Sequence, residues 1–101
     1  MREFVELARE ALAQARRIQV VLRESRALIE VHAVGLAPCG NPAVYGWQVS
    51  ESGVMAADGA GWKLLPLTDA VECCLGTERS LAPRLGYRPE ATGLAEVWFQ
   101  Y

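Results

Sequence analysis

The sequence predicts a small, mainly β domain of the α+β class, in which an N-terminal helix precedes a strongly bent antiparallel sheet or barrel of five strands. Apolar residues recur at helical spacing near the N-terminus. Further along they alternate with polar residues or form short runs between turn-forming clusters. A chain of 101 residues has the usual length of one domain. We divide it into a helix at 1–17, barrel strands at 18–75, a loop at 76–93 and a closing strand at 94–101.

The predicted helix covers the stretch REFVELAREALAQARR, which holds neither glycine nor proline and is rich in alanine. One side of this helix is charged, and the other side carries apolar residues at i, i+3 and i+4 spacing. The apolar residues are Phe4, Leu7, Ala8, Ala11, Leu12 and Ala15. We expect this stripe to face the core.

Five segments are predicted to be strands, because each is short and either alternates between apolar and polar residues or is rich in β-branched and aromatic residues. They are IQVVLR (18–23), ALIEVHAVGL (27–36), AVYGWQV (43–49), WKLLPL (62–67) and LAEVWFQY (94–101). The first two are expected to pair as a hairpin across the polar turn ESR, and Gly46 is expected to mark a bend or bulge. Pro66 indicates an edge strand or a strand end. The segment TDAVECCL (68–75) is compatible with either a strand or a short helix.

Two longer connections complete the chain. SESGVMAADGAG (50–61) is predicted to be a loop, and GTERSLAPRLGYRPEATG (76–93) a long irregular segment. The second holds Arg84, Tyr87 and Arg88, and two arginines around a tyrosine suit a phosphate or a carboxylate. The alternative is that Pro83 and Pro89 stiffen a plain connector, which Tyr87 pins to the barrel.

Composition narrows the function classes. The net charge is −2 and the pI is near 5.4, so the chain has no general basic field that would attract nucleic acid. No apolar run approaches the roughly 20 residues needed to cross a bilayer, and the N-terminus lacks an apolar signal core. The three cysteines give neither a disulfide framework nor zinc spacing. We expect a cytoplasmic protein without membrane association, metal or cofactor.

No catalytic constellation is visible in the sequence. It lacks Ser-His-Asp spacing, a phosphate-cradling glycine loop ahead of a helix, and a carboxylate pair in an evident pocket. Cys73 and Cys74 would point to opposite sides of a strand, and small core filler is the expected role of the cysteines. The sequence therefore predicts a protein that is not an enzyme.

His32 is the only histidine, and alternation places it on one strand face with Glu30. A histidine near a carboxylate suits proton transfer or a pH-sensitive ligand contact. The alternative is a hydrogen-bonded structural pair inside the barrel or at its rim.

The tryptophans at 47 and 62 each follow a glycine. Trp47 lies mid-strand among apolar neighbours and is predicted to pack in the core. Trp62 opens its strand beside Lys63, a placement that suits a pocket rim where stacking and a cation hold a planar or anionic ligand. Core packing of Trp62 is the alternative.

The order of several short motifs resembles the WYL domain family, in particular its short, stand-alone bacterial members. The motifs are Glu30-Val31-His32, Gly40-Asn41, Trp62-Lys63 and the segment PRLGYR at 83–88. The sequence departs from the family pattern where Pro42-Ala43-Val44 replaces the Trp-Tyr-Leu tripeptide, where Pro66 replaces a ligand-facing arginine, and where Val31 replaces a proline. The chain also contains no helix-turn-helix with which to read DNA.

The resemblance implies an Sm-like barrel core and a role in transcriptional regulation, with a ligand sensed through basic and aromatic residues. We therefore expect a non-enzymatic module that binds an anionic small molecule, a nucleotide or single-stranded nucleic acid. The expected ligand-binding residues are His32, Trp62, Lys63, Arg84, Tyr87 and Arg88. The alternative is a module that docks onto a protein partner or associates with itself, because the strand EVWFQY is apolar on both faces.

Overall fold

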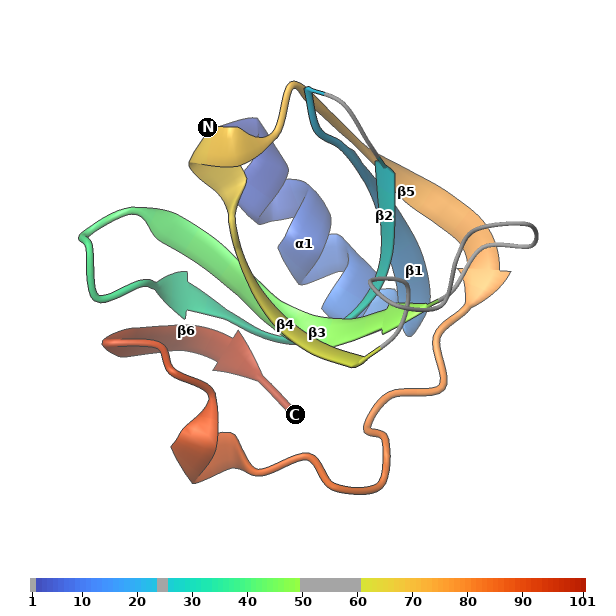
Figure 1. The fold of residues 1–101 in the computed structure, drawn as a ribbon. Coiled ribbons are helices and arrows are strands. Elements are labelled where there is room, and N and C mark those ends of the chain that lie inside the picture. Colours follow the sequence, from blue (N-terminus) through green and yellow to red (C-terminus); the bar gives the residue numbers. More distant parts are fainter. Residues whose placement is uncertain (1, 24–25, 50–60) are drawn as a thin grey trace.

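One helix packs against a bent antiparallel sheet in the computed structural model, which describes residues 2–23, 26–49 and 61–101. The sheet curves around the helix, and the segment between the last two strands lies on the opposite side of the sheet (Figure 1). The helix and strands are α1 (Arg2–Gln14), β1 (Arg16–Val21), β2 (Arg26–Leu36), β3 (Pro42–Val49), β4 (Gly61–Pro66), β5 (Glu72–Arg79) and β6 (Glu96–Gln100). Short 3-10 turns cover Leu67–Asp69 and Pro89–Ala91.

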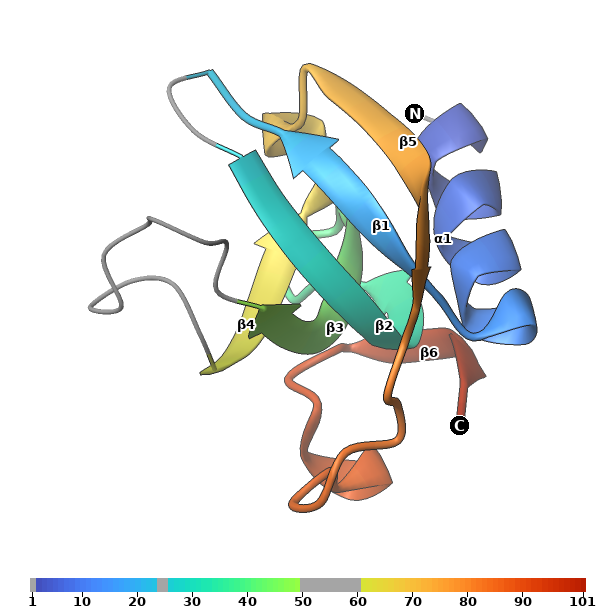
Figure 2. The same ribbon diagram turned by 90° about the vertical axis from the view of Figure 1, so that its right-hand side faces the viewer.

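The sheet has six strands, in the order β4-β3-β2-β1-β5, with β6 paired to β2. β3 runs along one edge of β2, and the other edge is shared (Figure 2). On that edge β1 pairs with Arg26–Glu30, and β6 pairs with Ala33–Leu36. Between these two stretches the β2–β3 register shifts, since Val31 faces Gly46 whereas Ala33 faces Tyr45. His32 is therefore the extra residue of a bulge at the place where β2 changes partners.

The apolar core lies between α1 and the concave face of the sheet. Alternation along β1, β2 and β3 directs one set of side chains toward the helix, as the sequence predicts. The buried members of this core are Ala8, Ala11, Ile18, Val20, Ala27, Ile29, Val31, Val34, Val44, Leu67 and Cys73. Phe4, Leu7 and Leu12 from the predicted helical stripe pack against them.

The helix is shorter than the predicted range of 1–17. It ends at Gln14, because Ala15 adopts a left-handed φ of 53° that breaks the helical path. Arg16 and Arg17 belong instead to β1, which pairs with β5 as far as Arg79. In the sequence these two arginines continue the helical pattern, but pairing with the distant strand β5 sets their conformation.

The prediction of five strands is also wrong, because the ambiguous segment 68–75 yields both a 3-10 turn and the start of an additional strand. That strand, β5, extends to Arg79, so the long connection begins at Ser80 rather than at residue 76. The side chains of residues 77–79 are exposed, and the segment therefore lacks the apolar alternation by which a strand is recognised. The Arg16 guanidinium donates to the Gly76 carbonyl at 2.8 Å and helps to hold this end of β5 on β1.

The remaining strand predictions agree with the structure to within one or two residues. The β1–β2 hairpin is confirmed, and Pro66 is the last residue of β4, which ends the strand order. In the predicted turn ESR, Glu24 and Ser25 lie outside the described residues, as does the predicted loop over 50–60. No helix in the described part of the chain is long and apolar enough to cross a bilayer.

The cysteine side chains divide as the sequence predicts for adjacent strand residues. Cys73 is buried in the core, where desolvation raises the pKa of its thiol to about 11, whereas Cys74 is exposed. Cys39 is exposed as well, so core filler describes only Cys73. Among the described residues, no group of three or more His, Cys, Asp and Glu side chains is placed to hold a metal ion.

Candidate binding site

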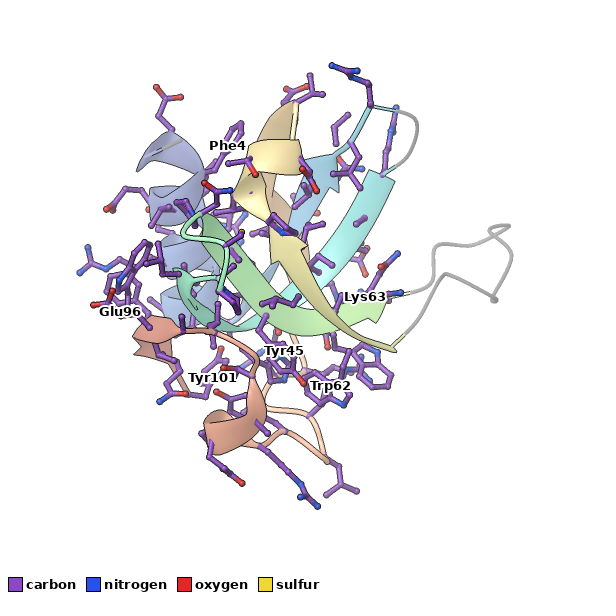
Figure 3. The ribbon with its side chains drawn as sticks, turned by 60° about the vertical axis from the view of Figure 1, so that its left-hand side comes forward. Phe4, Tyr45, Trp62, Lys63, Glu96 and Tyr101 are labelled. Atoms are coloured by element: carbon purple, nitrogen blue, oxygen red, sulfur yellow. The ribbon has the colours of Figure 1, made fainter. Side chains whose placement is uncertain are left out.

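Aromatic rings gather where the sheet meets the segment that follows β5. They come from β2, β3, β4, the segment after β5 and the residue after β6. We call this group the aromatic cluster; its members are His32, Tyr45, Trp47, Trp62, Tyr87 and Tyr101. Figure 3 shows Tyr45 and Trp62 pointing from the sheet toward the segment that follows β5.

Trp62 is the centre of the aromatic cluster. Its ring stacks on Tyr45 with centroids 5.3 Å apart and planes within 1° of parallel. Trp47, which lies directly opposite Trp62 in the β3–β4 register, meets it edge to face at 5.3 Å. His32 approaches from β2 at 4.8 Å, also edge to face. Offset-stacked and edge-to-face arrangements are the favoured geometries of aromatic pairs, so these rings stabilise one another.

Trp47 therefore lies outside the core into which the sequence places it. Val44 points into the core, and alternation along β3 therefore turns Tyr45 and Trp47 to the opposite face of the sheet. The Trp47 ring is half-buried, and the guanidinium carbon of Arg84 lies 5.2 Å from the ring centroid, within the range of a cation–π interaction.

His32 is completely buried, and both of its ring nitrogens are occupied. Nδ1 lies 2.8 Å from the carbonyl oxygen of Glu30, and the backbone amide of Arg84 donates to Nε2 at 2.9 Å. A carbonyl only accepts and an amide N–H only donates, so the ring is neutral and carries its proton on Nδ1. Burial is the largest influence on the pKa of His32, and the pKa is lowered below its ordinary value. This arrangement is the hydrogen-bonded structural alternative, although His32 pairs with the Glu30 backbone rather than with its carboxylate.

The Glu30 carboxylate is the centre of a buried ionic network. It accepts hydrogen bonds from Arg17 Nε at 2.9 Å, from the backbone amide of Leu81 at 3.1 Å, and from Arg84 Nε. Arg17 also pairs with Glu78 at 2.9 Å. Burial acts to raise the pKa of Glu30, but the bonds from Arg84, Leu81 and Arg17 outweigh it and the pKa is lowered. Glu30 is thus ionised and fully paired.

The connection from Ser80 to Ala95, which we call the strap, covers the aromatic cluster. Gly86 passes close to the Trp62 indole nitrogen, because a Cβ on Gly86 would lie 3.9 Å from it. Polar contacts attach the strap: those of Leu81 and Arg84 already described, and the Tyr87 hydroxyl, which lies 3.1 Å from Gln100 Oε1 and 3.3 Å from the His32 carbonyl. By contrast, the Leu81 and Leu85 side chains are 61% and 100% exposed. The strap is thus held by hydrogen bonds and by the Tyr87 ring, whose centroid lies 5.0 Å from that of His32.

The structure brings together four of the residues predicted to bind a ligand: His32, Trp62, Arg84 and Tyr87. Lys63 is exposed and follows Trp62 on β4, so alternation points its side chain away from the cluster (Figure 3). Arg88 is exposed on the strap. Arg84 does not stand free for an anion, because its guanidinium is paired with Glu30.

Sequence reasoning missed several members of this site. Tyr45 alternates with the core residue Val44 on β3, and this pattern alone marks it as facing away from the core. Tyr101 and Arg17 carry no comparable local signal, because they reach the site through the pairing of β6 and β1 with β2. Comparison with known proteins finds no match for this chain among family models, curated proteins or solved structures.

Proposed function

We propose that this protein is a non-enzymatic, WYL-like binding module with an Sm-like core, and that it binds a ligand with a planar ring at the aromatic cluster. A nucleotide, a single-stranded nucleic acid or another anionic small molecule with such a ring is the expected ligand class. The single observation that carries the proposal is the half-buried, stacked pair of Tyr45 and Trp62 at the centre of several further rings.

The charge distribution favours recognition of a ring over recognition of a phosphate. Arg17 and Arg84 are neutralised by Glu30 and Glu78, so this group of four charges sums to zero. Stacking of a base on an aromatic side chain contributes about 1–3 kcal/mol. We therefore assign most of the affinity to the cluster, with exposed Arg88 as the cation nearest in sequence to Tyr87 for an attached anionic group.

Two features support the family and fold parts of the proposal. Three residues in the motifs that carry the WYL resemblance contact one another: Glu30, His32 and Arg84. They do so although Arg84 lies 54 residues from Glu30 and 52 residues from His32. The helix before a bent antiparallel path of β4-β3-β2-β1-β5 suits an Sm-like core.

The same contacts support a role without catalysis. Neither His32 nor Glu30 has a free position for proton transfer to a substrate, because their polar atoms are all engaged in internal bonds. The cysteines are all unpaired, which suits a reducing compartment, and the proposal includes a cytoplasmic location.

Substitution of Trp62 tests the proposed function. We expect Trp62→Ala to weaken the binding of adenosine and guanosine nucleotides or of oligo(dT) by about tenfold to a hundredfold, because it removes the central stacking surface. Binding is measured by titration calorimetry and by the ligand-induced rise in melting temperature.

The matched control is Trp98→Ala, since Trp98 is a partly exposed tryptophan on β6 that is not a member of the aromatic cluster. Its binding constants are expected to equal those of the unaltered protein. Equal binding by the Trp62→Ala and Trp98→Ala proteins would contradict the assignment of the site, and absence of binding to any ring-bearing ligand by the unaltered protein would contradict the function.

A second candidate function is self-association through β6. Val97 and Trp98 are 36% and 37% exposed on this strand, and Tyr101 after it is 37% exposed. Such an apolar strand suits pairing with a second copy. We expect light scattering to show a mass that rises with protein concentration, and Trp98→Lys to return it to that of one chain; a monomer mass at every concentration rejects this candidate.

A further inference from the structure

Gly86 and Tyr87 of the strap lie against Trp62, and Tyr45 is stacked on the same ring, so a ligand ring that stacks on the strap side of Trp62 needs the strap to move. Two polar anchors on β2 hold the first residues of the strap, ahead of the contact that the Tyr87 hydroxyl makes with the His32 carbonyl. One is the Glu30 carboxylate, which accepts from Leu81 N and from the Arg84 side chain. The other is His32 Nε2, which accepts from the Arg84 backbone amide at 2.9 Å. The Leu81 and Leu85 side chains are exposed, so the apolar contact of this half of the strap comes from the Tyr87 ring, which packs against His32 and Trp62.

The His32 anchor depends on the protonation state of the ring. Nδ1 is committed as a donor to the Glu30 carbonyl, so the neutral ring has a lone pair only on Nε2. Protonation would place a hydrogen on Nε2, directed at the Arg84 N–H. Two donors then face each other in a buried position, and the hydrogen bond is replaced by repulsion.

The groups around His32 come from β2, β4, the strap and the end of the chain. Its charged and titratable neighbours are Glu30, Arg84, Tyr87 and Tyr101, and Trp62 contributes an uncharged ring. Burial opposes protonation of His32, the Glu30 backbone bond and carboxylate favour it, and Arg84 opposes it, with a lowered pKa as the result. The neutral ring and the closed strap therefore stabilise each other.

We propose that the strap is a pH-responsive cover, which moves away from His32 and Trp62 when His32 takes up a proton and so opens the ligand site on acidification. The role of opening in ligand access rests on the proposed function, whereas the opening itself does not. Release of the strap exposes His32 to water, where its pKa returns toward 6.5. At a pH above that value, closure of the strap is therefore fully favoured. Below it, the ratio of closed to open molecules falls by up to about tenfold per pH unit, until the pH reaches the lower pKa that His32 has in the closed state.

The test uses the unaltered protein without ligand, between about pH 8 and pH 5. His32 is the only histidine, so its imidazole NMR signals are assigned without ambiguity. Amide hydrogen exchange of the strap is followed in the same samples and corrected for the intrinsic pH dependence of exchange. At the upper end of the pH range we expect His32 to be the Nδ1–H tautomer. As the pH falls and the ring takes up a proton, we expect amide exchange of the strap to become faster while the amides of α1 stay protected.

Two variants accompany this measurement. His32→Gln retains an amide donor and an acceptor but does not titrate, so its strap exchange is expected to be independent of pH. Tyr87→Phe removes only the hydroxyl contacts of the strap, so its exchange should be about fivefold faster at every pH with the same pH dependence.

Three results would overturn the proposal: strap exchange that does not respond to titration of His32, an unchanged pH response in His32→Gln, or loss of α1 protection together with that of the strap. Failure of the proposed function gives a different result. In that case the strap opens as expected, while nucleotides and oligo(dT) fail to bind at either end of the pH range.

Discussion

Replacing Glu30 by glutamine is expected to lower the free energy of unfolding by about 3 kcal/mol at neutral pH. The carboxylate is completely buried and compensates Arg17 and Arg84, whose side chains are only 13% and 27% exposed. Glutamine leaves the Arg84 guanidinium without its balancing charge in a place that water reaches poorly, and it leaves Arg17 only the exposed Glu78. Removal of one partner from a buried ionic group costs more than the group contributes, because the remaining charge stays desolvated.

Urea unfolding of the unaltered protein and of the Glu30→Gln protein measures this effect, and Glu78→Gln is the control. Glu78 also pairs with Arg17 at 2.9 Å, but its side chain is 68% exposed. Because exposed pairs contribute little, we expect Glu78→Gln to cost less than about 0.5 kcal/mol. Equal costs for the two substitutions would show that the buried carboxylate is not the centre of the network.

The loss of stability caused by Glu30→Gln is expected to depend on pH. The pKa of Glu30 is lowered from its ordinary value of 4.5, so the charged form stabilises the folded state above that value. This contribution is lost as the pH falls through the lowered pKa. The stability difference between the unaltered protein and Glu30→Gln should therefore narrow below about pH 4.5, and a difference that is constant over this range would contradict the assignment.

Replacing Gly46 by alanine is expected to lower the free energy of unfolding by about 3 kcal/mol. A Cβ at this position would collide with the Glu30 carbonyl oxygen and would lie 2.9 Å from Ile29 Cγ2. The carbonyl belongs to the backbone of the central strand and accepts from His32 Nδ1, so it has no free direction in which to move. The β2–β3 pairing must separate at the bulge instead.

Gly40→Ala is the control for this substitution. Gly40 has a φ of +91° but nothing within 4 Å of the position of a Cβ, so alanine there meets only the cost of a left-handed backbone, about 1–2 kcal/mol. Thermal or urea unfolding compares the two variants. If Gly46→Ala is no more destabilising than Gly40→Ala, the close approach of β3 to β2 does not require glycine.

Much of the fold follows from local patterns. The α1 stripe and the alternation along β1 to β3 identify most of the core, because periodicity reports which face of an element is buried. The patterns fail at Arg16 and Arg17 and again at residues 76–79. In both places polar side chains lie on strands whose conformation is set by backbone pairing between β1 and β5, which leaves no apolar period to detect.

For the candidate site, the sequence alone determined the residue types: a histidine near a glutamate, a tryptophan at the start of a strand, and arginines around a tyrosine in a long connection. Only the tertiary structure decided their roles. The register of β2 with β1 and the path of the strap bring Arg17 and Arg84 to one carboxylate, so Arg84, one of the two arginines of the predicted anion clamp, belongs to an internal ionic network instead. The bulge at His32 directs its ring to the strap. The contacts of Arg84 join residues more than 50 positions apart, and no local periodicity encodes any of these contacts, because they depend on which strands pair and in what register.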